Sequence, residues 1–202
     1  SKPENYRPIS LTCIASKVLE HIVTSHIMKF MERNNILFPQ QHGFRSKLSC
    51  ETQLVELVCD ISKELDAGQE VDACLLDFSK AFDKVNHAKL LSKMRKIGLC
   101  NQVVDWTAAF LRDRTQTVTL RGTSSNPCPV TSGVPQGSVI GPALFLIYIN
   151  DLPNRVKSKV RLFADDTIIY TTANNSDQLM SDLKSLEAWE REWNMEFHPA
   201  KC

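Results

Sequence analysis

Carboxylates at the ends of two apolar segments are the residues in this sequence most able to do chemistry. Residues 71–76 lead into Asp77, and residues 162–164 lead into Asp165 and Asp166. Neighbouring carboxylates repel, and their burial is unfavourable unless a cation or a shifted pKa compensates the charge. Mg²⁺ prefers carboxylate oxygens and keeps water and phosphate oxygens as its other ligands. If the two segment ends meet, these three acids could hold two ions about 3.5–4 Å apart for an in-line displacement at phosphorus.

Each acidic signal also has a plain structural explanation. Asp is a favoured turn residue, so Asp165-Asp166 alone fits a solvent-exposed hairpin turn. Asp77 alone fits a helix cap in front of residues 79–82. The hypothesis of a metal site therefore depends on the two signals taken together, because neither decides the matter separately.

Hydrophobic periodicity predicts the elements that must position these acids. Helical spacing predicts helices over residues 15–33, 54–65, 87–97, 102–112, 138–149 and 179–193. Strands are predicted over residues 70–77, 115–121, 159–165 and 167–172, with 128–131 pairing back and another strand beginning at 195–197. Asp165-Asp166 falls at the bend of a tight hairpin. Strands separated by helices predict an α+β fold whose antiparallel sheet has helices on one face.

Composition narrows the class of protein. The length of 202 residues suits one domain or two closely joined lobes. The longest apolar run, residues 143–149, is far shorter than a membrane span, so we expect no membrane partner. The net charge is only +1, but residues 79–96 hold six Lys or Arg and one Asp, and residues 155–161 hold four Lys or Arg and no acid. Such runs bind nucleic-acid phosphates or form solvated helix faces, and both interpretations stay open.

The cysteines indicate no metal cluster. Seven cysteines are present, and none has the spacing of a CxxC pair or a zinc finger. Their odd number and their positions in apolar stretches predict buried, reduced thiols in an intracellular protein.

Five motifs in order resemble those of the reverse transcriptases of non-LTR retrotransposons, the jockey-like elements in particular. Two resemble finger motifs: Tyr6-Arg7-Pro8-Ile9-Ser10-Leu11 and Gln41-His42-Gly43-Phe44-Arg45. Three resemble palm motifs: Asp77-Phe78-Ser79-Lys80-Ala81-Phe82-Asp83, Ser132-Gly133-Val134-Pro135-Gln136-Gly137-Ser138-Val139-Ile140-Gly141-Pro142, and Phe163-Ala164-Asp165-Asp166. The match in order and spacing covers essentially the whole chain, which makes a chance match negligible.

The resemblance implies roles for the acids. Asp77 and Asp165 would bind two Mg²⁺ ions, with Mn²⁺ as the alternative metal. Asp166 would be the second acid of the catalytic hairpin, and the backbone carbonyl of Phe78 would complete one metal shell. Ala164 would lie beside the 3′ end of the primer.

The resemblance also implies a nucleotide-binding pocket. Backbone N–H groups of Lys80 and Ala81 would face the triphosphate, and Phe82 would be the aromatic gate that leaves no room for a 2′-hydroxyl. Its alternative role is a plain core residue. Gln136 and Gly137 would line the pocket for nucleotide and template. The planar guanidinium of Arg7 would bind the triphosphate in a bidentate manner, or form a surface ion pair.

Other charged residues receive weaker assignments from the resemblance. Lys201 stands where the family has a lysine that gives a proton to departing pyrophosphate. The family has Asn three residues earlier, whereas this chain has His198. Lys2 is a candidate for a second triphosphate-binding lysine. Arg45 would shape the fingers or contact the template backbone, and Asp83 is interpreted as structural.

The implied fold is the fingers and palm of a right-hand polymerase, with an antiparallel RRM-like palm sheet. Residues 1–70 would be part of the fingers, and 71–202 the palm, with a finger insertion near 84–130. We expect a longer polypeptide, in which the start of the fingers precedes residue 1 and the primer grip and thumb follow Cys202. We therefore expect the 202 residues alone to polymerise weakly or not at all.

The expected activity is RNA-directed DNA polymerisation by two-metal-ion transfer of a nucleotide from dNTP to a primer 3′-hydroxyl. The expected partners are an RNA template, a DNA primer and dNTP, together with the thumb and endonuclease domains of the same polyprotein, and the family implies a location in the nucleus. Two alternatives remain. One is a catalytically inactive, nucleic-acid-binding descendant, and the other is an RNA-templated RNA polymerase, against which Phe82 argues.

Overall fold

A computed structural model describes residues 9–199 and 201–202. Its N-terminal part holds two long helices, α1 (Ile14–Arg33) and α2 (Cys50–Asp66). A capping box begins α2, because the Ser49 side chain accepts from the Thr52 backbone N–H and the Thr52 hydroxyl accepts from the Ser49 N–H. Gly68, at a φ of 75°, then turns the chain into β1 (Val71–Leu76). Both predicted helices are confirmed, with α2 starting earlier than its apolar pattern does.

Three antiparallel strands form the main sheet, in the order β1–β7–β6. The hairpin strands are β6 (Lys159–Phe163) and β7 (Asp166–Thr172). The central strand, β7, pairs with β1 from Val71↔Thr172 to Leu76↔Thr167. It pairs with β6 from Lys159↔Tyr170 to Phe163↔Asp166. The predicted antiparallel sheet is confirmed, and Asp166 opens β7 instead of lying at the bend.

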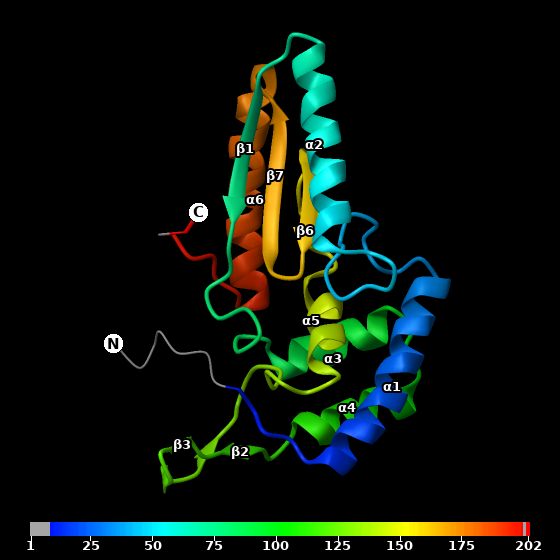
Figure 1. Cartoon of the computed structure of the whole chain (residues 1–202), viewed down its shortest axis with the longest axis vertical. Coiled ribbons are helices and arrows are strands. Elements are labelled where there is room, and N and C mark those ends of the chain that lie inside the picture. The colour runs from blue at the N-terminus through cyan, green and yellow to red at the C-terminus, as the bar shows by residue number, and fades with distance from the viewer. Residues whose placement is uncertain (1–8, 200) are drawn as a thin grey trace.

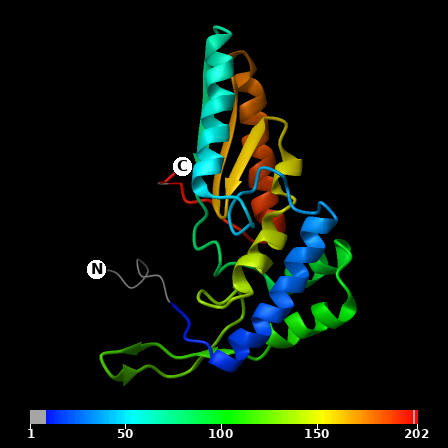
Figure 2. The same cartoon turned by 45° about the vertical axis from the view of Figure 1, so that its right-hand side comes forward.

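Two long helices flank this sheet. Because side chains alternate along a strand, Leu162 and Ile169 are buried on one face, while Arg161 and Tyr170 point to the other. Arg161 and Tyr170 contact Asp60 of α2. The last helix, α6 (Ser176–Trp193), packs behind β7 (Figures 1 and 2). The sheet therefore has a helix along each face, where the sequence predicted helices on one face only.

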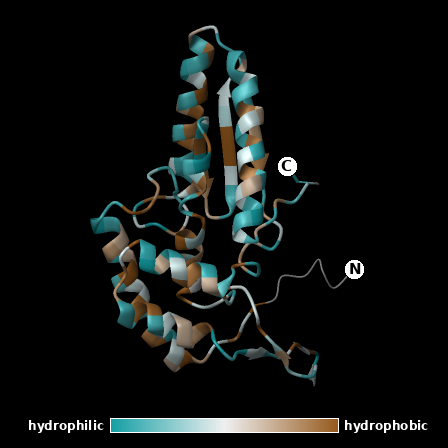
Figure 3. Cartoon of the chain, turned by 180° about the vertical axis from the view of Figure 1, so that it is seen from behind, coloured by the Kyte–Doolittle hydropathy of each residue, from teal (hydrophilic) through white to brown (hydrophobic). Residues whose placement is uncertain are grey.

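The middle of β7 is hydrophobic between α2 and α6, as the view from behind shows (Figure 3). Below the sheet, four helices gather (Figure 1), and each contributes buried apolar residues to one core. They are α1, α3 (His87–Lys96), α4 (Asn101–Leu111) and α5 (Gly141–Ile149). Every residue of α5 except Pro142 is buried, so this helix lies at the centre of the core. Within the described residues, no helix combines the length and the apolar character needed to cross a bilayer.

A buried lysine joins three of these elements. Lys93 of α3 places its Nζ 2.6 Å from Oδ1 of Asp151, within hydrogen-bonding reach of the Tyr148 carbonyl, and 3.5 Å from the centre of the Trp193 ring. Burial lowers its pKa to about 8. One member of the basic run at residues 79–96 is therefore part of the core and is not available to bind phosphate.

The segment between α4 and α5 departs from its predicted strand. Residues 115–121 form two short pieces, β2 (Thr115–Gln116) and β3 (Thr119–Leu120). β2 pairs with β5 (Cys128–Pro129), and β3 pairs with β4 (Thr123–Ser124). All four pieces are exposed, so no buried face keeps the alternating pattern in one continuous strand. Short 3₁₀ turns over Leu152–Arg155 and Ala173–Asn175 complete the described elements.

The prediction of buried cysteines is wrong. Six of the seven are exposed, and Cys74 is half-buried. Cys13 and Cys100 stand at helix N-caps, and Cys50 is the first residue of α2, where the chain turns outward. The apolar neighbours that suggested burial belong to helix faces that begin one or more residues later.

Candidate active site

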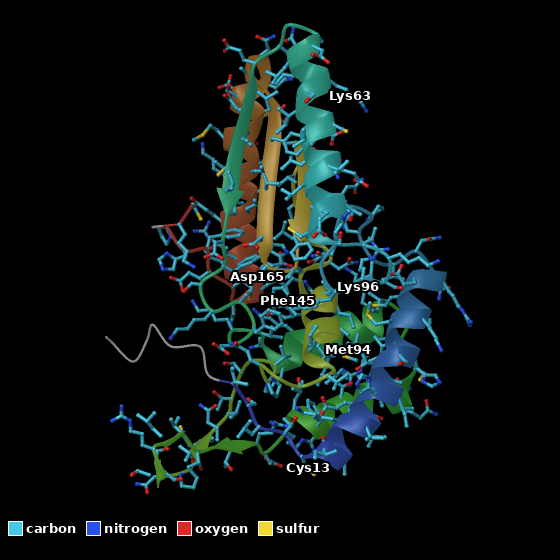
Figure 4. All side chains as sticks on the ribbon, in the orientation of Figure 1. Cys13, Lys63, Met94, Lys96, Phe145 and Asp165 are labelled. Atoms are coloured by element: carbon cyan, nitrogen blue, oxygen red, sulfur yellow. The ribbon has the colours of Figure 1, made fainter. Side chains whose placement is uncertain are left out.

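The ends of β1 and β7 bring the predicted acids to one end of the sheet. Leu76 pairs with Thr167, so Asp77 and Asp166 occupy the next positions of the two neighbouring strands. Asp165 lies in the turn before β7, at the lower end of the hairpin (Figure 4). Asp166 is exposed, whereas Asp77 and Asp165 are half-buried. The strand register thus places the three acids at the end of the sheet that faces the helical part of the molecule.

The turn before Asp165 is held by the loop at residues 40–45. Ala164 is buried and has a φ of 55°, which is unusual for a residue other than Gly. The Gln41 side chain holds it from both sides, because Oε1 accepts from the Ala164 N–H at 2.9 Å and Nε2 donates to the Ala164 carbonyl at 3.2 Å. A Cβ on Gly43 would lie 2.2 Å from the Ala164 nitrogen. Only glycine at 43 allows the loop to lie this close to the turn.

Asp77 is fixed by the chain that follows α6. The backbone carbonyl of Asp77 accepts from His198 N–H at 2.7 Å, and the rings of Phe78 and Phe197 stack with centroids 4.4 Å apart. The strand predicted to begin at residues 195–197 is realised as a single antiparallel bridge between these two phenylalanines. Through this bridge the Lys201 amine reaches Oδ2 of Asp77, at 2.6 Å.

The segment after Asp77 turns sharply and presents an aromatic ring. Lys80 has a φ of 55° and is exposed, and Ala81 is buried. The Phe82 ring stacks on Phe145 of α5 with centroids 4.5 Å apart and receives the edge of Phe44 at 6.2 Å. Phe82 is only half-buried, so it touches the core with one face and keeps part of its surface exposed. Its contacts are those of a core residue on one face, and its role as a gate stays a prediction.

The turn at residues 133–137 packs directly on that segment. The side-chain amide of Gln136 donates to Oδ1 of Asp83 at 3.0 Å, and the backbone carbonyl of Gln136 accepts from Ser10 N–H at 2.7 Å. A Cβ on Gly137, whose φ is 102°, would lie 2.8 Å from the Ser10 carbonyl, and one on Gly133 would lie 2.7 Å from that of Asp83. The structural role expected for Asp83 is supported, since it holds the Gln136 amide. Arg7 and Lys2 lie outside the described residues.

A carboxylate of α1 supports the same turn from below. Glu20 is fully buried, and its Oε2 accepts from the backbone N–H of Val139 at 2.7 Å and of Ile140 at 3.3 Å. Ser16 donates to its other oxygen at 3.0 Å. A negative charge at a helix N-terminus satisfies otherwise unpaired N–H groups and the helix dipole. This contact ties α1 to the start of α5.

Behind the acids, a buried cation joins the sheet to α2. Arg161 donates to Asp60 and Glu56 of α2 and to the Tyr170 hydroxyl, at 3.0 Å in the last case. Burial pushes the pKa of Asp60 upward, but its hydrogen bonds to Tyr170 and Arg161 outweigh that effect and lower it. Burial raises the pKa of Tyr170 to about 12. Arg161 belongs to the basic run at residues 155–161, and its burial in this network makes it unavailable to bind phosphate.

The side chain of Arg45 is also held in intramolecular hydrogen bonds. Its guanidinium binds both carboxylate oxygens of Glu32, at 2.9 and 2.7 Å, and donates to the carbonyl oxygens of Phe38 and Gln41. These bonds close the loop at residues 34–45 onto α1, so Arg45 has a structural role here, and its part in the fingers stays a prediction.

Within residues 9–199 and 201–202, no three His, Cys, Asp or Glu side chains stand close enough together to hold a metal ion. A site for Mg²⁺ needs only one or two carboxylates when phosphates and waters supply its other oxygens. The ammonium of Lys201 already rests on Asp77, so this carboxylate is placed to pair with a positive charge. The acids therefore fit a metal site that substrate completes, and the prediction of three converging ligands stays a prediction.

A profile of the family described as "Reverse transcriptase (RNA-dependent DNA polymerase)" matches residues 1–202. The chain belongs to this family. It is 32% identical over 211 residues to a probable RNA-directed DNA polymerase from transposon BS of Drosophila melanogaster. It is 30% identical over 211 residues to the RNA-directed DNA polymerase from mobile element jockey of Drosophila funebris. Each alignment covers 98% of this chain and 23% of the relative, so the chain spans about a quarter of their length.

Solved structures of telomerases share the fold of this reverse transcriptase chain. Telomerase from Candida albicans, in a complex with a fragment of telomeric RNA, superposes with a TM-score of 0.65 at 14% identity, over 92% of this chain and 34% of that one. Apo telomerase from Candida tropicalis gives 0.66 at 12% identity, over 92% and 36%. The family resemblance predicted from the five motifs is confirmed, as is the mixed helix-and-strand polymerase fold.

Sequence reasoning named the finger motif at residues 41–45 but gave Gln41, Gly43 and Phe44 no role in this reverse transcriptase site. Their contacts are with Ala164 and Phe82, more than 35 positions away along the chain. A glycine inside an otherwise polar loop signals close approach of another backbone. That signal could have found Gly43, whereas nothing in the sequence states which backbone approaches it.

Proposed function

We propose that this chain is the nucleotidyl-transfer core of an RNA-directed DNA polymerase of a non-LTR retrotransposon. The observation that carries the proposal is the pairing of β1 with β7, which sets Asp77 beside Asp166, with Asp165 in the adjoining turn. Carboxylates in this arrangement suit transfer of a nucleotide from dNTP to a primer 3′-hydroxyl. The names of the curated relatives agree with that activity.

Asp77, Asp165, Asp166 and the backbone carbonyl of Phe78 would hold two Mg²⁺ ions, or Mn²⁺ in their place. The chemistry supplied by such ions is activation of the primer 3′-hydroxyl and neutralisation of the triphosphate and the departing pyrophosphate. The chain itself supplies rigid placement of the carboxylates. The Asp77 carbonyl is bonded to His198, and the turn before Asp165 is held by Gln41, so little reorganisation is needed as charge develops.

The remaining predicted residues would bind and orient the nucleotide. Phe82 presents a ring backed by Phe145, which would exclude a 2′-hydroxyl, and the backbone N–H groups of Lys80 and Ala81 would face the triphosphate. Gln136 and Gly137 would line the pocket, with the Gln136 amide fixed by Asp83.

Three further residues complete the proposed roles. Arg7 would bind the triphosphate. Ala164 would support the primer end from its buried turn. Lys201 would give a proton to the leaving pyrophosphate, for which it would have to turn away from Asp77.

The proposed partners are an RNA template, a DNA primer and dNTP. Since the chain spans about a quarter of its curated relatives, we propose that it acts within a longer polypeptide that also carries a thumb and an endonuclease, and that works in the nucleus. Residues 1–70 and the segment near 84–130 would serve as fingers, and the rest of 71–202 as the palm. The clustering of α1, α3 and α4 below the sheet supports that division, whereas α2, which also belongs to residues 1–70, packs along the sheet (Figure 1).

Primer extension by the full-length protein that contains this chain tests the proposal. An RNA template with a DNA primer is offered either dNTP or NTP in Mg²⁺. We expect extension with dNTP only, and a loss of at least about 1000-fold for Asp165→Ala, which removes a group that stabilises the transition state. Asp105→Ala, which removes an exposed acid on α4, is the matched control.

The other outcomes assign the other functions. No extension with either sugar, combined with binding of the primer–template, would identify an inactive nucleic-acid-binding descendant. Preferential use of NTP would identify an RNA-templated RNA polymerase.

A further inference from the structure

An exposed aromatic residue with an unfavourable positive backbone φ lies beside the proposed sugar gate. Phe44 has a φ of 58°, and 52% of its side chain is exposed. Bulky residues rarely adopt positive φ, and the surrounding structure must enforce it where they do. A residue that only fills the core would be buried, so stability alone does not explain an aromatic ring here.

The ring of Phe44 meets Phe82 at a right angle. Their centroids are 6.2 Å apart with an interplanar angle of 90°, an edge-to-face arrangement within the favourable range for aromatic pairs. On its other side Phe82 lies flat on Phe145, at 4.5 Å and 22°. The gate ring is thus supported from behind by the palm core and from a second direction by the fingers. Without Phe44, the Phe82 ring would keep only its stacking contact with Phe145 among these ring contacts.

The loop that carries Phe44 is anchored immediately before and after it. On the N-terminal side, Gln41 binds the backbone of Ala164, and Gly43 lies against the same residue. On the C-terminal side, Arg45 binds both oxygens of Glu32. Phe44 therefore has little freedom to move, and its ring is set at a fixed position relative to both the catalytic turn and Phe82.

We infer that Phe44 is a positioning residue for sugar selection, which holds the Phe82 ring in the place where it excludes a 2′-hydroxyl. The inference rests on the proposed function. It assigns to the finger motif at residues 41–45 a part in specificity, acting through Phe82 and not by contact with the sugar. The loop at residues 41–45 then contacts both the turn at Ala164 and the ring of Phe82, so that it fixes the position of one relative to the other.

The test measures sugar discrimination, defined as kcat/KM for dNTP divided by kcat/KM for NTP, in the full-length protein. An aromatic pair contributes about 0.5–1.5 kcal/mol beyond its burial, so we expect Phe44→Ala to lower discrimination by about 2- to 13-fold. Phe44→Leu should fall between Ala and wild type, and Phe44→Tyr should restore the ratio lost in Phe44→Ala. Leu120→Ala, which shortens a side chain that is 71% exposed on β3, is the matched control.

A double-mutant cycle decides whether Phe44 acts through Phe82. If it does, Phe44→Ala causes no further loss of discrimination in a Phe82→Ala background. An equal loss in both backgrounds would overturn the inference, as would an unchanged ratio in Phe44→Ala, even where both rates fall together. Failure of the wild-type protein to extend with dNTP would instead refute the proposed function, so the two failures are distinguishable.

Discussion

The Nζ of Lys201 lies 2.6 Å from Oδ2 of Asp77, so the chain after α6 closes onto the acid that ends β1. More than half of the Lys201 side chain is exposed, and an ion pair this open is weak. The Lys201 amine therefore has two alternative positions, one on Asp77 and the other at the proposed pyrophosphate site. An ammonium and a divalent ion would compete for the same Asp77 carboxylate, while the proposed proton donation to pyrophosphate needs the amine elsewhere.

Removing the Lys201 charge should therefore strengthen divalent binding. We expect Lys201→Gln to tighten Mn²⁺ binding in the absence of nucleotide by about 2- to 5-fold, the range of an exposed ion pair. Titration followed by the electron spin resonance signal of free Mn²⁺ measures it. Lys84→Gln, which removes a lysine paired with Glu196 and not with Asp77, is the control. Unchanged or weaker Mn²⁺ affinity in Lys201→Gln would contradict the competition.

Contact between Gly43 and Ala164 should make position 43 intolerant of any side chain. A Cβ there would lie 2.2 Å from a backbone nitrogen that cannot move without distorting the catalytic turn, so Gly43→Ala should destabilise the fold by about 3 kcal/mol. Gly68→Ala is the matched control, because its Cβ would meet open space and only the strain of a φ of 75° remains, about 1 kcal/mol. Urea unfolding followed by tryptophan fluorescence compares them, and equal losses would argue against the close packing.

The hydrogen bond from Gln136 to Asp83 should tune nucleotide binding. Asp83→Ala frees the amide to rotate, and a bond to a charged group contributes about 1.5 kcal/mol or more, so KM for dNTP should rise about 10-fold. The kcat should change less, because Asp83 does not reach the reacting atoms. Asp72→Ala, at the far end of β1, is the control. Additive effects of Asp83→Ala and Gln136→Ala on KM would show that the bond has no such role.

Lys93 should make stability depend on pH in alkaline solution. Burial lowers its pKa in the folded state to about 8, below the unfolded value near 10.4, so between these values the unfolded chain binds more protons. The contribution of Lys93 to the free energy of unfolding should therefore increase from pH 8 to 10.5, by up to about 3 kcal/mol.

Comparison with Lys93→Met isolates that contribution, because the other groups titrate in both proteins. The difference in free energy of unfolding, wild type minus Lys93→Met, should rise over this pH range. A difference that stays constant from pH 7 to 10.5 would mean that the Lys93 pKa is not depressed.

Much of the fold was predictable from local signals, even in α1, where Val18, Leu19 and Ile22 of the apolar pattern are exposed. The helices α1, α3 and α6 and the β6–β7 hairpin follow from periodicity and turn residues, and α5 follows from a continuous apolar run. At two places the local sequence pattern led to a wrong prediction. The Thr115–Arg121 segment alternates like a strand yet breaks in two, and Cys13 and Cys50 lie exposed at the very start of α1 and α2.

The acids of the candidate site were predictable from the sequence, whereas the residues that hold the surrounding turns in place were not. Asp77, Asp165 and Asp166 stand at strand ends, which a sequence shows. The partners of Gln41, Glu20 and Asp83 lie between 53 and 123 positions away along the chain, and only the folded structure selects them. The same holds for Lys93 and Arg161, whose charges looked suitable for phosphate but are buried in ion pairs.

The most direct test of the account is to map where a divalent ion binds. Fe²⁺ replaces Mg²⁺ in the full-length protein with primer–template and dNTP, and ascorbate with peroxide then generates hydroxyl radicals that cut the backbone beside the bound ion. We expect cleavage at two places, near Asp77 and near Asp165, both lost in Asp165→Asn and retained in Asp105→Asn. Cleavage at only one of the two, or at neither, would contradict the convergence of these acids on one metal site.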